Sequence, residues 1–143
     1  MAEVIIEKHY KTDPETLFAY LTEEQHMANW WGPEGTTVQT EHLAFGSSGS
    51  WMVIMLGDDS GARHKVTGEI LEYDPPHAVR FTWAWHDDDD VRGHESEVAY
   101  IIEREGEGVK FTLRHTGLED EESAINHNGG WSSSLGKLDN VFI

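Results

Sequence analysis

Cysteine is absent from the 143 residues of this chain. Its absence excludes disulfide bonds, thiolate catalysis and cysteine-ligated zinc. It also removes any reason in the sequence to assign the protein to an oxidising compartment. Any chemistry that the chain performs must therefore use other side chains.

Basic residues are scarce. Ten lysines and arginines stand against 27 aspartates and glutamates, which gives a formal net charge of −17. Charge of this sign repels phosphate backbones and anionic lipid surfaces at long range, which argues against nucleic-acid binding. Acidic residues scattered along a chain are typical of a well-solvated surface.

Long apolar segments, repeats and linkers are also missing. The longest apolar run, Trp51 to Leu56, is too short to cross a bilayer, and the first residues lack the basic and apolar regions of a secretory signal. The length of the chain is that of one domain. We therefore expect a single domain over residues 1–143, in the cytoplasm, without membrane insertion.

Tryptophan, in contrast, is plentiful. The chain has six, at positions 30, 31, 51, 83, 85 and 131. Each can bury roughly 150–250 Å², which contributes about 4–6 kcal/mol when the ring leaves water. We expect these side chains to pack against one another or to line a cavity.

Two short helices are predicted after a first strand over residues 3–10. The first helix begins at Thr12-Asp13-Pro14-Glu15, which supplies a capping side chain, a proline in the first turn and an acid near the positive end of the dipole. The second is expected to begin at Thr22, with Glu23 and Glu24 in its first turn, and to end before Gly32-Pro33.

From about residue 36 to residue 116, apolar and polar residues alternate and turn residues recur at short intervals. This pattern is typical of an antiparallel sheet. Six strands are predicted here, over residues 36–45, 50–57, 63–73, 78–86, 94–104 and 108–116. Alternate residues of the fourth fall on one apolar and aromatic face, and these are Val79, Phe81, Trp83 and Trp85.

A longer helix is predicted over residues 120–142, because acidic residues 119–122 suit a helix N-terminus. At about 100° per residue, one narrow stripe should face the sheet, made of His127, Trp131, Leu135, Leu138 and Phe142. Gly129 and Gly130 each cost roughly 1 kcal/mol relative to alanine inside a helix. We expect close backbone packing or an open space beneath the helix to compensate.

Several motifs are spread over the whole chain. They are Pro14-Glu15-x-x-Phe18-x-x-Leu21-Thr22, Trp30-Trp31-Gly32-Pro33, Gly46 with Gly49-x-Trp51, Gly68-Glu69-Ile70, Pro75-Pro76, Phe81-Thr82-Trp83, His115-x-Gly117-Leu118 and His127-x-x-Gly130-Trp131-x-x-x-Leu135-x-x-Leu138. Together with the order of the elements, they resemble the START-like superfamily, also called SRPBCC. Within it, the chain is similar to the activators of the heat-shock-protein-90 ATPase.

This resemblance implies an α+β, helix-grip fold. A curved seven-stranded antiparallel sheet would wrap around the long C-terminal helix, two short helices would follow the first strand, and a cavity would lie between sheet and helix. The candidates for lining this cavity are Trp30, Trp31, Trp51, Phe81, Trp83, Trp85, Phe111, His115, His127 and Trp131.

His115 and His127 are the polar candidates, because each falls on the apolar face of its own element. Three interpretations stay open. They are core histidines satisfied by backbone or water, contacts to a ligand, or proton-transfer groups that titrate near neutrality. No nucleophile or paired carboxylate is identifiable near them in the sequence.

Two loops carry further hypotheses. Trp30-Trp31-Gly32-Pro33 is expected to form either a wall of the cavity or a plug, with one of the two indoles turned inward. The segment from His86 to Asp90, with His94, has residue types that bind cations, but it lacks the ligand spacing of a calcium loop. We interpret it as a solvated hairpin tip and predict neither a metal site nor a cofactor.

The leading hypothesis is a protein that binds a small apolar or aromatic molecule, such as a lipid or a polyketide-like compound. The second is a cyclase or hydratase that uses His115 or His127 as an acid or base on a bound substrate. The third, implied by the resemblance alone, is a cochaperone-like activator with a heat-shock ATPase as its partner.

Overall fold

The computed structural model describes residues 2–31, 36–38, 49–57 and 63–142. The elements in chain order are β1 (Ala2–Tyr10), α1 (Pro14–Thr22), α2 (Glu24–Trp30), β2 (Thr36–Val38), β3 (Gly49–Gly57), β4 (Arg63–Asp74), β5 (Ala78–Trp85), β6 (Ser96–Glu105), β7 (Gly108–Leu118) and α3 (Glu121–Asp139).

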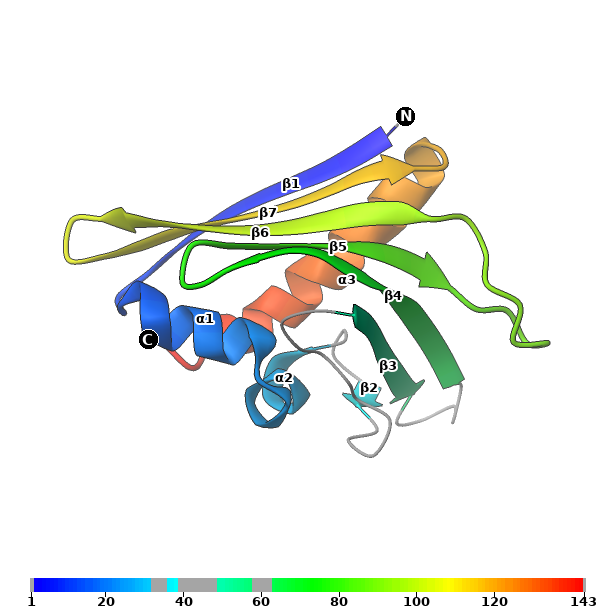
Figure 1. Ribbon diagram of the computed structural model, residues 1–143, viewed down its shortest axis with the longest axis horizontal. Helices are drawn as coiled ribbons and strands as arrows, with labels where there is room; N and C mark the ends of the chain where they lie inside the picture. The colour runs from blue at the N-terminus through cyan, green and yellow to red at the C-terminus, as the bar shows by residue number, and fades with distance from the viewer. Residues whose placement is uncertain (1, 32–35, 39–48, 58–62, 143) are drawn as a thin grey trace.

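Within these residues the strands form one antiparallel sheet in the order β1-β7-β6-β5-β4-β3-β2. Six strands are long, and β2 is a three-residue edge strand beside β3. The helix α3 runs across one face of the sheet, and α1 and α2 lie near the C-terminal end of α3 (Figure 1). The predicted α+β class, with a long C-terminal helix against an antiparallel sheet, is confirmed.

The boundaries differ from the predictions at a few places. Of the strand predicted over residues 36–45, β2 covers residues 36–38, and residues 39–45 lie outside the described part of the chain. The same holds for Gly32-Pro33 and for Gly46. The final helix ends at Asp139 rather than near residue 142.

The helix α1 begins where a side chain satisfies one of its free N–H groups, whereas Glu23, the N-cap of α2, makes no such side-chain hydrogen bond. Asp13 Oδ1 accepts the backbone N–H of Thr16 at 2.7 Å, and Pro14 follows as the first helical residue, as predicted. Thr22, which we expected to begin the second helix, instead ends the first. Its hydroxyl donates to the carbonyl of Phe18 at 2.8 Å, one turn back within α1.

The sheet has a close contact between a glycine and an indole. Gly68 of β4 is paired with Trp51 of β3, and Trp51 Nε1 donates to the carbonyl of Thr82 at 2.9 Å. A Cβ placed on Gly68 would overlap both this carbonyl oxygen and Trp51 Nε1. Glycine at this position therefore leaves room for the indole of Trp51 to reach the Thr82 carbonyl of β5.

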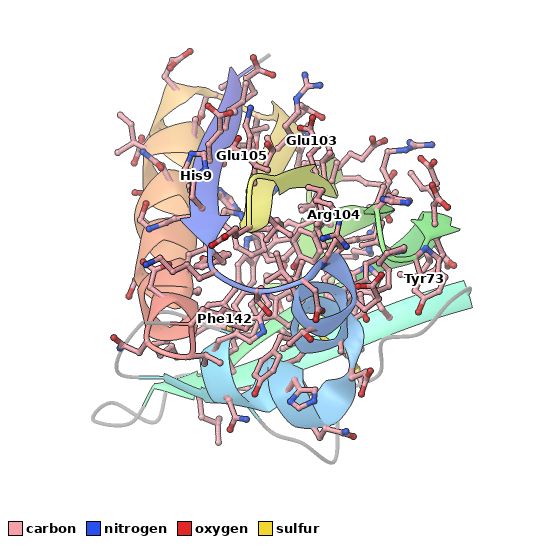
Figure 2. The ribbon with its side chains drawn as sticks, turned by 90° about the vertical axis from the view of Figure 1, so that its left-hand side faces the viewer. His9, Tyr73, Glu103, Arg104, Glu105 and Phe142 are labelled. Atoms are coloured by element: carbon pink, nitrogen blue, oxygen red, sulfur yellow. The ribbon has the colours of Figure 1, made fainter. Side chains whose placement is uncertain are left out.

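The final helix is held at its C-terminal end by β1. Asp139 accepts hydrogen bonds from Lys8 Nζ at 2.9 Å and from Tyr10 Oη at 2.8 Å. Phe142, beyond the last turn, lies with its ring centroid 5.3 Å from those of Tyr10 and Tyr20 (Figure 2). These contacts join α3 to the edge strand and to α1.

Charged side chains gather on the outside of the molecule, as the net charge predicts. At the turn between β6 and β7, Glu103, Arg104 and Glu105 project outward, and His9 of β1 lies beside them (Figure 2). His9 Nδ1 is 2.8 Å from a carboxylate oxygen of Glu105. None of the helices in the described part of the chain has both the length and the apolar character needed to cross a membrane.

We expect Gly68→Ala to lower the free energy of unfolding by about 2–3 kcal/mol, because the added methyl group displaces Trp51 from Thr82. Urea denaturation followed by tryptophan fluorescence measures this change. Gly129→Ala is the matched control, because a Cβ there meets nothing within 4 Å. It should raise stability by up to about 1 kcal/mol, and equal effects of the two substitutions would contradict the contact.

Candidate ligand-binding cavity

The interior is organised around Trp31, which is 2 % exposed. Its ring centroid lies 6.2 Å from that of Trp30, 5.5 Å from Trp51, 6.0 Å from Trp83 and 6.4 Å from Trp131. Rings at these distances attract one another through their edges and faces. The tryptophans that are far apart in the sequence therefore form one cluster between the sheet and α3.

A cavity of about 510 Å³ lies beside this cluster, between α3 and the strands β3, β4 and β5. It is bounded by Trp31, Met55, His64, Trp83, Trp85, Asn126, His127, Gly130, Trp131 and Ser134. His64 and Asn126 are exposed and mark its mouth, whereas Trp31, Trp83 and Trp131 form its buried floor. The described residues of the lining include no aspartate, glutamate, lysine or arginine.

The structure divides the ten predicted cavity residues into two groups. The residues that bound the cavity are Trp31, Trp83, Trp85, His127 and Trp131. The others are buried in the adjoining core, and they are Trp30, Trp51, Phe81, Phe111 and His115. The aromatic rings occupy much of the interior themselves, which is why residues on the same apolar face do not all reach the cavity.

Of the two successive tryptophans, only Trp31 reaches the cavity. Trp30 is fully buried and turns its indole N–H toward the carbonyl of Tyr20, at 2.7 Å. Trp31 serves both as a wall of the cavity and as the centre of the cluster. Trp31 is therefore the indole that lines the cavity, and Trp30 packs in the adjoining core.

Sequence reasoning missed several lining residues. Met55 and His64 are register partners on β3 and β4, but the sequence pattern did not define that pairing. Gly130 drew notice in the sequence because a glycine inside a helix lowers its stability. It lies on the cavity wall, which fits the open space expected beneath α3. A Cβ at Gly129 meets nothing within 4 Å, so close packing does not explain that glycine.

His115 is fully buried on β7 and both of its ring nitrogens have partners. Trp131 Nε1 donates to His115 Nδ1 at 3.0 Å, so His115 carries its proton on Nε2 and donates it to Ser96 Oγ at 2.7 Å. The Ser96 hydroxyl in turn donates to the carbonyl of Trp83, at 3.3 Å. Burial, and to a smaller extent the neighbouring His127, lowers the pKa of His115 from 6.5 to about 3.

His127 is arranged in the same way on α3. Trp85 Nε1 donates to His127 Nε2 at 2.9 Å, and His127 Nδ1 donates to the carbonyl of Ser123 at 2.7 Å. Burial lowers the pKa of His127, and the bond to Ser123 partly opposes this shift. The centroids of the His115 and His127 rings are 4.8 Å apart. Two charged rings so close together would repel each other, so neutral imidazoles fit this geometry.

These hydrogen bonds favour one of the three interpretations of the histidines. In both residues one ring nitrogen accepts an indole N–H and the other donates to an oxygen. Neither imidazole has a free lone pair with which to take a proton from a substrate. Their geometry is that of core histidines with satisfied hydrogen bonds, which join α3 to the sheet.

Among the residues that the structure describes, two buried side-chain polar atoms have no hydrogen-bond partner, Trp83 Nε1 and Tyr100 Oη. Tyr100 is 1 % exposed on β6 and does not line the cavity. Burial raises the pKa of Tyr100, so its hydroxyl stays protonated. Trp83 is 4 % exposed and does line the cavity.

The acidic segment between β5 and β6 forms an exposed tip. His86 Nδ1 lies 3.0 Å from Asp90 Oδ1, and Lys65 Nζ lies 3.2 Å from the same oxygen. Asp87 Oδ1 accepts the backbone N–H groups of Asp89 and Val91. In the residues that the structure describes, no group of three or more histidines, aspartates or glutamates is placed to hold a metal ion.

A family model for the activator of Hsp90 ATPase homolog 1-like proteins, AHSA1, matches residues 11–142. The chain belongs to the AHSA1 family. This family is part of the START-like, or SRPBCC, superfamily, and the resemblance inferred from the motifs is thereby confirmed. A search of curated proteins finds no match.

Solved structures agree with this assignment. The chain is similar to an AHSA1 protein from Silicibacter pomeroyi, with 39 % identity, a TM-score of 0.91 and coverage of 97 % of this chain and 96 % of that one. A protein from Chromobacterium violaceum is 20 % identical, with a TM-score of 0.87 and coverage of 98 % and 96 %. A Mycobacterium smegmatis protein is 18 % identical, with a TM-score of 0.80 and coverage of 99 % and 90 %. The last two show the shared fold alone.

We expect acid to destabilise the protein through His115. Its pKa is lower in the folded state than in the unfolded chain, so the unfolded chain binds the proton more readily between pH 6.5 and pH 3. The stability that neutral His115 contributes is thus complete above pH 6.5 and is lost as the pH falls. The loss is about 2 kcal/mol by pH 5.

Urea denaturation of the wild type and of His115→Gln from pH 7.5 to pH 4 tests this expectation. Glutamine offers an acceptor to Trp131 and a donor to Ser96 but does not titrate, so subtracting the two curves removes the effect of the many carboxylates. The wild type should lose stability relative to the variant as the pH falls. A constant difference would contradict the lowered pKa.

Tyr100→Phe should raise the free energy of unfolding by about 1 kcal/mol, because it removes a buried hydroxyl that has no partner and changes the packing little. Thermal denaturation measures the change. A loss of stability would indicate that the hydroxyl forms a hydrogen bond in solution.

Proposed function

We propose that this AHSA1-family protein binds a small, uncharged, apolar or aromatic molecule in the cavity between α3 and strands β3 to β5. The observation that carries the proposal is the cavity of about 510 Å³ whose floor is made of the buried indoles Trp31, Trp83 and Trp131. Cavities of roughly 300–1,000 Å³ with apolar walls and few polar groups are typical of small-molecule sites.

The charge of the protein supports an uncharged ligand. The net charge of −17 repels anions at long range. The described lining has no carboxylate to pair with a cation and no lysine or arginine to pair with an anion. An ion would lose its hydration in this cavity without gaining a partner of opposite charge.

Binding is better supported than proton transfer. A general acid or base needs a pKa near the working pH and a free position toward the substrate. The pKa of His115 is lowered to about 3, and both nitrogens of His115 and of His127 are already engaged. We therefore do not assign a cyclase or hydratase activity to these residues. Activation of a heat-shock ATPase stays a prediction from the family, since no contact described above bears on it.

Two substitutions of neighbouring glycines test the site. Gly130→Leu places a side chain into the cavity, whereas Gly129→Leu adds the same side chain at an exposed position where a Cβ meets nothing within 4 Å. The neutral dye N-phenyl-1-naphthylamine, which fluoresces in apolar sites, serves as the probe. We expect Gly130→Leu to weaken its binding at least about tenfold, equivalent to about 1.4 kcal/mol, and Gly129→Leu to leave it within about twofold.

Circular dichroism of both variants should show that they are folded before the titrations are compared. Equal affinities of the two variants would place the dye elsewhere and contradict the proposed site. Native mass spectrometry of the protein purified from its own cells would then identify a retained molecule, and the Gly130→Leu variant should have lost it.

A further inference from the structure

Indole donors outnumber imidazole acceptors at the floor of the cavity. Trp83, Trp85 and Trp131 surround His115 and His127, and Trp83 lies 5.3 Å from the first ring and 6.2 Å from the second between centroids. His115 accepts the N–H of Trp131, and His127 accepts the N–H of Trp85. The third indole donor, Trp83 Nε1, is buried and has no hydrogen-bond acceptor among the described residues.

Neither imidazole can also accept a hydrogen bond from the N–H of Trp83. A neutral imidazole has one acceptor nitrogen, and in both histidines the other nitrogen donates to an oxygen, of Ser96 or of Ser123. A buried donor without a partner is unfavourable, and such groups in a folded protein call for a reason. Because Trp83 is also a wall of the cavity, a ligand is the partner that the site can still admit.

We propose that the ligand carries a carbonyl oxygen on an otherwise aromatic or apolar body, and that Trp83 Nε1 donates a hydrogen bond to this oxygen. This rests on the proposed function and adds the chemical class of the ligand and the residue that selects it. A carbonyl needs no acceptor in return. A hydroxyl group would bring a donor of its own to a place where both imidazole acceptors are already occupied.

The indole nitrogen is covered by its neighbours, so the ligand oxygen reaches it only when a side chain of the wall shifts. Trp85 is the least buried of the lining indoles, and its ring centroid is 5.4 Å from that of Trp83. Because this N–H is unpaired before binding, a ligand with an acceptor gains one hydrogen bond from it and a ligand without an acceptor gains none.

A matched pair of probes tests this selection. In 2-acetylnaphthalene a carbonyl oxygen stands where 2-isopropenylnaphthalene has a methylene group, and the two molecules are otherwise nearly equal in shape. Isothermal titration calorimetry should show that the wild type prefers the ketone by about tenfold, as one hydrogen bond predicts. Trp83→Phe should abolish this preference. Tyr100→Phe, which removes the other unpaired donor outside the cavity, should keep it.

A second measurement uses the wild type without substitution at the wall. In a ¹⁵N-labelled sample, the indole N–H signal of Trp83 should move to higher frequency on binding the ketone and not on binding the hydrocarbon. Trp83→Phe assigns that signal by its disappearance, and if this variant is unfolded, neighbouring-proton contacts assign it instead.

The outcomes separate this inference from the proposed function. If both probes bind the wild type equally and the Trp83 signal does not distinguish them, the cavity binds ligands but the selection by Trp83 is wrong. If neither probe binds, the proposed function and this inference fail together. A tenfold preference that survives in Trp83→Phe would assign the carbonyl to another donor and overturn the inference.

Discussion

The hydrogen bonds from indole N–H groups to neutral imidazoles are the interaction on which this interior depends. They join α3 to the sheet twice, through Trp131 to His115 and through Trp85 to His127. Each requires a bare imidazole nitrogen, so both histidines must stay uncharged. Burial supplies that condition by lowering both pKa values, and the serine and carbonyl partners hold the remaining proton on the opposite nitrogen.

The cavity is the space that this arrangement leaves open. The indoles around Trp31 fill the middle of the interior, and Gly130 leaves room beneath α3 at its side. The acidic residues stay on the outer surface, so the walls of the cavity combine aromatic rings with a few polar groups and no described ionic side chain. Trp83 belongs to both parts, because it packs in the cluster and also bounds the cavity.

Much of the fold could be predicted from local patterns. The cap at Asp13, the alternation along β5 and the stripe of Trp131 and Leu135 on α3 depend on residues close together in the sequence. The candidate site could be predicted only in part. Strand alternation places Phe81 and Trp83 on one face but does not tell which ring reaches the cavity, because Phe81 packs against Trp51 and Trp83 against Trp31, both from other elements.

The sequence by itself determined the order and type of the elements, the family and the aromatic character of the interior, because periodicity and motifs act over short distances along the chain. Only the tertiary structure decided which indole N–H donates to which imidazole nitrogen. His115 and Trp131 are 16 residues apart and Trp85 and His127 are 42 apart, so no local rule pairs them. The same packing left Trp83 without a partner, since three indoles converge on two imidazoles and each imidazole can accept one hydrogen bond.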